Sequence, residues 1–226
     1  MKQLIKIILF LAMVAVMAAP FFYWWPGAST SLNLPFSASL YLALFFPLFG
    51  MLALNLLWIQ FMVGAWRSML NSLFDPAKVL RYHIREGIIA YGIALIHPFL
   101  LYLSIKVVGL SYFGVLSSLP DSLKLYWSAG ILAFLLLTFA TLAGLLRKNK
   151  FVVRHWKKVH YFTYLALPLI LYHSWNIGSH VQSTTYKYFW WVFTISFILT
   201  ALVRLVHHIK KYHLTRQAKV EPINPP

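Results

Sequence analysis

The chain has 226 residues, of which 61% are hydrophobic, 18% are aromatic and only 11% are charged, and its mean hydropathy is +0.72. A soluble globular domain does not have this composition. The sequence contains no cysteine, which excludes disulfides, iron–sulfur clusters and thiolate-bound haem. The net charge of +16 does not indicate a nucleic-acid partner, because Lys and Arg lie between apolar runs instead of along one polar segment. We therefore expect a polytopic membrane protein that contacts lipid.

Six apolar runs are each close to the roughly 20 residues that a helix needs to cross a bilayer. In chain order they lie at about 4–24, 38–65, 83–108, 126–146, 159–177 and 188–207. The sequence therefore predicts an all-α fold, a six-transmembrane-helix bundle in a single domain at 1–210, followed by a basic tail at 211–226. We recognise no internal repeat.

Charge is distributed unevenly over the connections between these runs. The strongly basic connections are 67–85, 147–158 and the tail, whereas the other connections carry few charges. Because basic connections stay in the cytoplasm, we expect both termini there, and the tail to be cytoplasmic. The sequence thus predicts a multi-pass protein of a bacterial inner membrane.

Two of the predicted helices each carry a pair of histidines. His83 and His97 are separated by fourteen positions on the third helix, and His160 and His173 by thirteen on the fifth. Both helices cross in the same direction, and a rise of about 1.5 Å per residue separates the histidines of each helix by roughly 20 Å. The residues therefore form two pairs, His83 with His160 near the cytoplasm and His97 with His173 near the outside.

Helical rotation tests this pairing. At about 100° per residue, fourteen steps leave two side chains within about 40° of each other, so His83 and His97 share a face. Thirteen steps leave His160 and His173 about 140° apart on an ideal helix. We expect Pro168, which lies between them, to kink or re-register the helix and so remove this offset.

Paired histidines at membrane depth indicate haem binding. Ionisable groups are costly in the membrane and usually mark a function. Haem iron with two imidazole ligands is six-coordinate, which suits electron transfer. A single histidine is more often an interhelical hydrogen-bonding residue, but four at matched depths favour two b-type haems between the third and fifth helices. The predicted axial ligands are His83 with His160 and His97 with His173.

Charged residues near the cytoplasmic pair are expected to support that site. Arg81, Arg85, Arg154 and Lys157 lie at the level of the inner haem propionates and can pair with them as cations pair with carboxylates. Glu86, an acid near the start of the third run, is expected to pair with a neighbouring cation.

Small residues on the third run provide space. Gly87, Ala90 and Gly92 allow a flat macrocycle or another helix to approach closely. Two further histidines, His155 in the basic connection and His180 in an outer connection, have no assigned role.

A short motif leads into the fifth run. Its residues are Arg154, Trp156, Val159 and His160, and it continues to Tyr164 and His173. The motif is similar to the R-x-W-x-x-L-H signature of the YedZ/MsrQ haem-binding subunit of a methionine sulfoxide reductase system. With the paired histidine spacing, the segment 81–208 resembles the ferric-reductase-like transmembrane domain that this subunit shares with ferric-chelate reductases and NADPH oxidases. His83 stands where YedZ-type proteins tend to have a basic residue, so the resemblance leans toward the two-haem relatives.

The resemblance implies a membrane cytochrome that is an oxidoreductase component. Electrons would pass from a cytoplasmic-side donor, a separate flavin reductase carrying FMN or FAD or a quinol, through two haems to an extracytoplasmic redox acceptor. The two-haem relatives usually continue into FAD- and NADPH-binding domains, and this sequence has no Gly-rich dinucleotide fingerprint. We therefore expect a ferric reductase-like chain without its own flavin or NAD(P)H domain.

Three alternatives stay open at this point, and one of them is an assembly or scaffold protein with no bound cofactor. The chain could be a one-haem, YedZ/MsrQ-like subunit that uses His97 and His173. It could also be a proton- or metal-ion transporter in which the membrane histidines form a relay.

Overall fold

The structure, a computed structural model, describes residues 1–35 and 37–220. The described residues form helices and connecting turns with no β-strand among them, which confirms the all-α prediction. The helices are α1 (Lys2–Ser31), α2 (Ala38–Ala65), α3 (Arg67–Leu73), α4 (Pro76–Val107), α5 (Tyr112–Ser118), α6 (Asp121–Leu145), α7 (Trp156–His160), α8 (Thr163–Ile177), α9 (Ser179–Ser183) and α10 (Lys187–Val220). The end of the predicted tail, 221–226, lies outside the described residues.

Within the described chain, five helices are long and apolar enough to cross a membrane. They are α1, α2, α4, α6 and the Lys187–His213 part of α10. The chain is therefore a multi-pass membrane protein, as its composition predicts. The run predicted as one helix at 159–177 differs, because the short helix α7 and the 15-residue helix α8 take its place.

The third predicted helix begins earlier than its hydropathy indicates. Asp75 caps α4 by accepting a hydrogen bond from the backbone N–H of Lys78 at 2.8 Å, and Pro76 is the first helical residue. The helix therefore starts at Pro76 and not at His83, and the connection predicted at 67–85 is largely helical. An apolar run does not reveal this start, because the first turns of α4 are polar.

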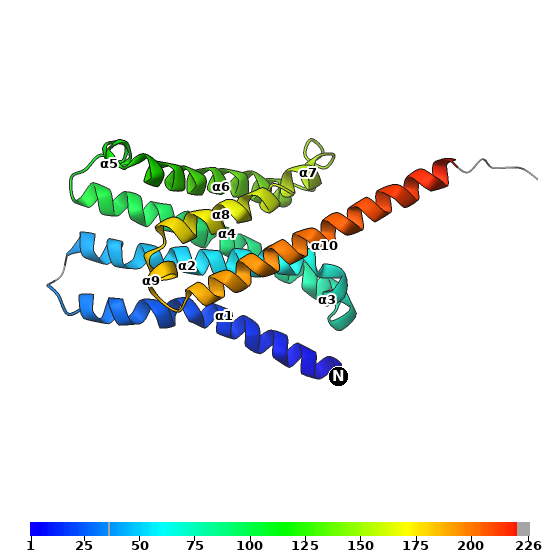
Figure 1. Ribbon diagram of the computed structural model, residues 1–226, viewed down its shortest axis with the longest axis horizontal. Helices are drawn as coiled ribbons and strands as arrows, with labels where there is room; N and C mark the ends of the chain where they lie inside the picture. The colour runs from blue at the N-terminus through cyan, green and yellow to red at the C-terminus, as the bar shows by residue number, and fades with distance from the viewer. Residues whose placement is uncertain (36, 221–226) are drawn as a thin grey trace, which may run out of the picture. The chain divides into compact units, whose positions relative to one another are not determined.

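Two helix pairs form the frame of the protein. α2 packs along α4, α6 packs along α8, and the pairs meet through contacts of α4 with α6 and of α2 with α8. Figure 1 shows these helices and α1 side by side, with α3 and α7 at one end and α5 and α9 at the other. The core between the pairs is built from small and branched apolar residues, which let helices approach closely. Its buried members are Ala53, Leu56, Leu57, Ala90, Ala94, Leu137 and Ala166.

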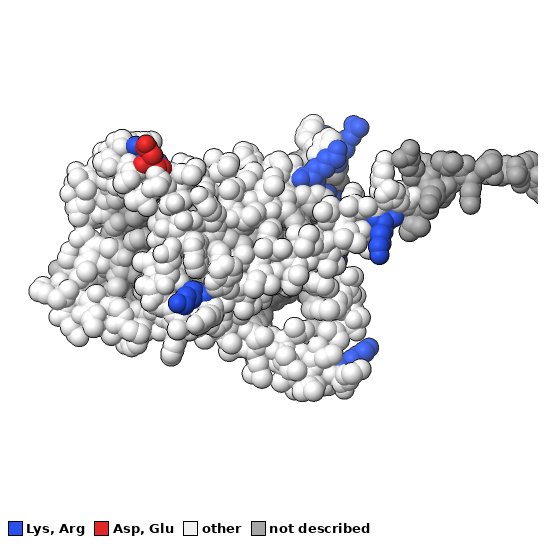
Figure 2. Space-filling model, viewed as in Figure 1, with Lys and Arg blue, Asp and Glu red and all other residues white. Residues whose placement is uncertain are grey.

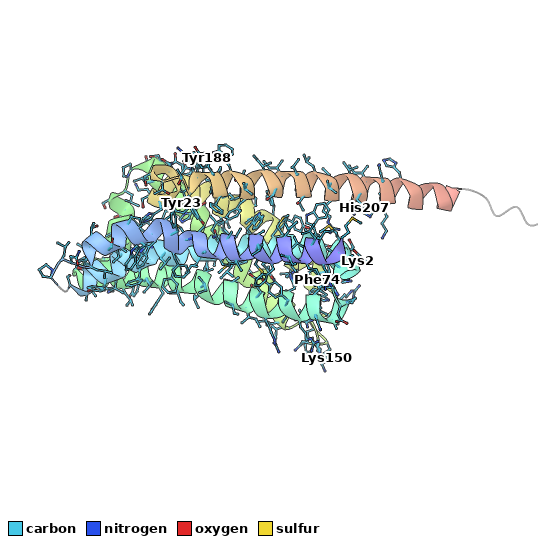
Figure 3. The ribbon with its side chains drawn as sticks, turned by 90° about the horizontal axis from the view of Figure 1, so that it is seen from below. Lys2, Tyr23, Phe74, Lys150, Tyr188 and His207 are labelled. Atoms are coloured by element: carbon cyan, nitrogen blue, oxygen red, sulfur yellow. The ribbon has the colours of Figure 1, made fainter. Side chains whose placement is uncertain are left out.

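Charged side chains gather at the ends of the helices. On the face drawn in Figure 2, Lys and Arg cluster over the α7 end, a small acidic patch lies beside the start of α6, and most of the surface between them is uncharged. Figure 3 shows Lys2, Phe74 and Lys150 toward the α7 end and Tyr23 and Tyr188 toward the other end. An uncharged belt with charged ends fits contact with lipid along the sides of the helices.

The chain divides into two compact units, Met1–Trp190 and the chain from Trp191 on, and the features below all lie in the first. A buried polar link helps to hold this unit together. Asn55 of α2, which is fully buried, accepts a hydrogen bond from the Tyr186 hydroxyl and donates its amide to the Val16 carbonyl of α1. Polar bonds of this kind fix helices that have no hydrophobic driving force for association in lipid.

Candidate functional site

Two cavities lie between the α2–α4 pair and the α6–α8 pair. One has a volume of about 430 Å³ and the other of about 360 Å³, both within the roughly 300–1,000 Å³ of small-molecule and cofactor sites. Leu57, Leu137 and Ile170 line both cavities, so these side chains form a shared wall between them. We call the larger one the basic cavity and the smaller one the apolar cavity, after the residues described next.

The basic cavity contains His83 of α4 and His160 of α7. The two imidazole ring centres are 6.3 Å apart and their planes are nearly perpendicular, at 83°. Three cationic side chains also line this cavity, Arg67, Arg147 and Lys157. Positive charge beside a pair of imidazoles suits a ligand that carries carboxylates.

The apolar cavity contains His97 of α4 and His173 of α8. None of the described residues that line this cavity is Lys, Arg, Asp or Glu, and most are aliphatic or aromatic. A third histidine, His180 of α9, lies in the lining, and burial lowers its pKa below the ordinary histidine value. The cavity is therefore uncharged when its three histidines are neutral.

Backbone carbonyls hold three of the four histidines in the same way. The bonds run from His97 Nδ1 to Phe46 O at 2.7 Å, from His173 Nδ1 to Tyr126 O at 3.0 Å and from His160 Nδ1 to Ala140 O at 3.1 Å. Because a carbonyl oxygen only accepts, Nδ1 carries the proton in each neutral ring. The Nε2 lone pair of each is then left for a metal, the usual arrangement of metal-binding histidines.

His83 departs from this arrangement. Its Nδ1 atom is buried without a hydrogen-bond partner among the described residues, and its Nε2 atom lies 3.5 Å from Nε2 of Gln60. A buried, unpaired imidazole nitrogen is energetically unfavourable unless a ligand satisfies it. His83 is therefore the least fixed of the four rings.

A glycine faces every one of these histidines. A Cβ added to the glycine would lie 2.5 Å from the ring at Gly130–His173, 2.9 Å at Gly50–His97, 3.1 Å at Gly64–His83 and 3.6 Å at Gly144–His160. The histidine rings thus occupy the space that a side chain at each glycine of α2 and α6 would fill. The two glycines of each helix are separated by fourteen positions, the same interval that separates His83 from His97.

Sequence reasoning did not find these four glycines. It selected Gly87, Ala90 and Gly92 on α4 instead, as residues that let a macrocycle or another helix approach, and the close approach of helices is confirmed for Ala90 in the core. The space beside Gly87 is taken by the Gln60 side chain, nothing lies within 4 Å of a Cβ on Gly92, and Ala90 belongs to the core. The available signal was the fourteen-position spacing of glycines on the neighbouring helices.

The rotational offset between His160 and His173 is removed by a break in the helix. α7 ends at His160, Tyr161 and Phe162 form a turn, and α8 begins at Thr163. The prediction that Pro168 performs this re-registration was wrong, because α8 continues through Pro168 as one helix. Tyr161 and Phe162 keep helical backbone angles, but the hydrogen bonds around them join residues three apart, so the chain winds more tightly there and changes the phase of the helix.

The cations of the basic cavity are also partly different from those predicted. Lys157 lines the cavity as expected, but Arg81, Arg85 and Arg154 do not. Arg147, which sequence reasoning did not single out, is half-buried there and donates from Nη1 to the carbonyl of Gly144 at 2.9 Å. The reason is that a helix turns each successive side chain by about 100°, so residues at one level face different directions.

Glu86 has neither a cation nor any other hydrogen-bond partner for its two carboxyl oxygens among the described residues. The expected ion pair is therefore absent from the described structure. The residue is buried on α4, with 5% of its surface exposed.

The histidines come as pairs and not as larger clusters. Among the described residues, no group of three His, Cys, Asp or Glu side chains lies together as a metal site built from protein ligands alone requires. Haem fits two imidazoles per cavity, because the macrocycle supplies four ligands and the protein supplies the axial ones. The 6.3 Å between the His83 and His160 ring centres accommodates a metal ion with metal–nitrogen bonds of about 2 Å.

Comparison of the chain with known protein families, with curated proteins and with solved structures finds no match. Function is therefore inferred from the two cavities and their histidines.

Proposed function

We propose that this chain is a membrane electron-transfer protein that binds two b-type haems, one in each cavity. His83 and His160 would be the axial ligands in the basic cavity, and His97 and His173 those in the apolar cavity. When bound, the haems would take up and release single electrons, the chemistry that two imidazole ligands favour. The observation that carries this proposal is that each pair of histidines shares a cavity and lies against glycines.

The glycines support a flat ligand in particular. Each imidazole ring packs against a glycine of α2 or α6, which has no side chain. The rings therefore fit between the helices without contacting a large residue at these positions. Small residues on α2 and α6 likewise let the faces of a planar group approach the helices. A cavity for a globular ligand or an ion has no need for four such positions.

The cations of the basic cavity support haem orientation. Arg67, Arg147 and Lys157 would pair with the propionates of the haem in that cavity, since guanidinium and ammonium groups form charge-assisted hydrogen bonds with carboxylates. The apolar cavity has no such residue among its described lining, so its haem would be held by its ligands and by apolar contact.

We further propose that α7 and α8 together make the sixth crossing and that both termini are cytoplasmic. The strongly basic connection 147–158 adjoins α7, which places the basic cavity on the cytoplasmic side by the positive-inside rule. Electrons would then enter at the basic cavity and leave from the apolar cavity. The donor would be a separate acidic flavin protein, attracted by the basic surface, or a quinol, and the acceptor an extracytoplasmic redox molecule or protein.

A second candidate is a one-haem subunit of the YedZ/MsrQ type that uses the apolar cavity alone. The unpaired Nδ1 of His83 favours it, because the basic cavity lacks the fourth carbonyl bond that would orient this ligand. In this version His83 and His160 would be structural.

The test is the dithionite-reduced minus oxidised absorption spectrum of the purified protein in detergent, with haem quantified per chain. Wild type, His83→Ala and His97→Ala are compared, and His155→Ala serves as a control that lines neither cavity. We expect low-spin b-type bands with about two haems per chain, falling to about one in each cavity variant and unchanged in the control.

The other outcomes separate the alternatives. One haem per chain in wild type, lost only in His97→Ala, establishes the one-haem subunit. A colourless protein from haem-replete cells refutes haem binding and leaves an ion transporter, which pH-dependent flux into proteoliposomes would reveal.

A further inference from the structure

We infer that Gln60 is a positioning residue for His83: its Oε1 accepts a hydrogen bond from the imidazole N–H and leaves the other ring nitrogen to bind the metal. This inference rests on the proposed function, because it concerns how one axial ligand of the basic cavity is held. It adds a residue that neither the histidine spacing nor the motif indicates.

Two unsatisfied atoms on two neighbouring side chains carry the inference. Oε1 of Gln60 and Nδ1 of His83 are both buried without a hydrogen-bond partner among the described residues. The same two side chains approach each other at 3.5 Å through Nε2 of each. The amide of a glutamine and the ring of a histidine can each be flipped end for end with little change in shape. Turning over the Gln60 amide alone brings Oε1 to Nε2 of His83, which can donate a hydrogen bond to it, and leaves the unpaired Nδ1 of His83 to bind the metal.

The position of Gln60 in the helix frame agrees with this role. In the other three sites the residue four positions before the facing glycine supplies the acceptor for the histidine. These residues are Phe46 before Gly50, Tyr126 before Gly130 and Ala140 before Gly144. Gln60 stands four positions before Gly64, which faces His83. At this one position a side-chain carbonyl takes the place of the backbone carbonyl.

Gly87 provides the space in which the Gln60 amide lies. A Cβ on Gly87 would collide with Nε2 of Gln60, the nearest side-chain atom to that position. By contrast, a Cβ on Gly92 of the same helix would meet nothing within 4 Å. Gly87 therefore keeps the amide beside His83, and Gly92 offers a matched control for substitution on α4.

The hydrogen bond has a consequence for the metal. An acceptor on one imidazole nitrogen raises the basicity of the other and so stabilises the oxidised metal. Loss of the acceptor is therefore expected to raise the reduction potential in the basic cavity alone. Because outer partners of metal-binding histidines typically matter by about tenfold or more, we expect a shift of about 59 mV, the one-electron equivalent of tenfold.

The experiment is a spectroelectrochemical titration of the full-length protein in detergent. The wave of the basic cavity is identified as the one lost in His83→Ala. Gln60→Leu removes the acceptor and Gly87→Ala displaces it, so both are expected to raise the potential of this wave only. Gln60→Glu keeps an acceptor oxygen and is expected not to raise the potential, and Gly92→Ala is expected to match wild type.

The other possible results either support or overturn the positioning role of Gln60. Loss of the haem from the basic cavity in Gln60→Leu, with retention in Gln60→Glu, supports the positioning role. Equal shifts of both waves, or no shift in Gln60→Leu while wild type binds two haems, overturns it and leaves the proposed function intact. A wild-type protein without haem in the basic cavity overturns both the two-haem function and this inference.

Discussion

The basic and apolar cavities share one frame and differ in how closely it holds their histidines. In the apolar cavity both rings donate to backbone carbonyls, and added Cβ atoms on the facing glycines would lie 2.5 and 2.9 Å from them. In the basic cavity the corresponding distances are 3.1 and 3.6 Å, and one ring has no backbone bond. The rings of the apolar cavity are thus held more closely, whereas the basic cavity differs by its three lining cations.

The largest loss of stability is expected from a substitution in the wall that the two cavities share. Leu137 is buried in the shared wall, and Leu137→Ala is expected to cost about 2–5 kcal/mol of stability and to loosen both sites. Thermal unfolding in detergent, followed by circular dichroism together with haem release, measures this. Leu132→Ala on the same helix is the control, because 49% of the Leu132 surface is exposed and the residue lines neither cavity. A haem lost from only one cavity would contradict the shared wall.

A methyl group added at a glycine should weaken haem binding in the apolar cavity more than in the basic cavity. Gly130→Ala places a Cβ 2.5 Å from His173, whereas Gly144→Ala places one 3.6 Å from His160, an ordinary contact. Overpacking costs roughly 1–3 kcal/mol, so we expect Gly130→Ala to bind the haem of the apolar cavity roughly 5- to 150-fold more weakly. Gly144→Ala should retain both haems. Haem per chain after dialysis against apomyoglobin measures the difference, and equal losses would show that the two cavities are equally tight.

A charge change should affect only the basic cavity. Arg147→Gln removes a half-buried cation from its lining. Less positive charge disfavours reduction, and a partly exposed charge pair is worth up to about 1 kcal/mol, which is roughly 40 mV for one electron. The potential of the basic-cavity haem should fall by up to this amount in a redox titration. Arg81→Gln, whose exposed side chain lies outside the lining, should have no effect.

The smallest effect concerns pH at the apolar cavity. Burial lowers the pKa of His180, so this residue gains a proton at a lower pH in the folded protein than an ordinary histidine does. The potential of the apolar-cavity haem should therefore be constant above neutral pH and rise on acidification, as a positive charge appears nearby. The variant His180→Gln should abolish that rise. A rise that persists in this variant would assign it to another group.

The membrane class and the paired histidines were accessible from the sequence for a definite reason. Hydropathy, charge asymmetry and the fourteen-position interval on α4 are properties of the chain itself and need no knowledge of neighbouring side chains. The identification of haem and the direction of electron flow are still predictions, which the spectra described above would test.

The features that the sequence did not predict depend on which helices pack against each other. Gly50 and Gly130 are inconspicuous in apolar runs, and only the packing of α2 on α4 and of α6 on α8 shows that they face histidines. The break at Tyr161 was missed because no glycine or proline marks it in the sequence. Gln60 was missed because a single amide in an apolar helix has meaning only beside the unpaired nitrogen of His83.

The glycine and histidine helices also alternate along the chain in a way that implies symmetry. Gly130 and Gly144 follow Gly50 and Gly64 by the same interval, and His160 and His173 follow His83 and His97 by nearly that interval. A glycine helix followed by a histidine helix therefore occurs twice, although the printed sequence shows no obvious repeat. An approximate two-fold axis along the helices would exchange the two hairpins and map each cavity onto itself. Each cavity is then completed only when two equivalent hairpins meet, as in the interface of a homodimer that has been joined into one chain.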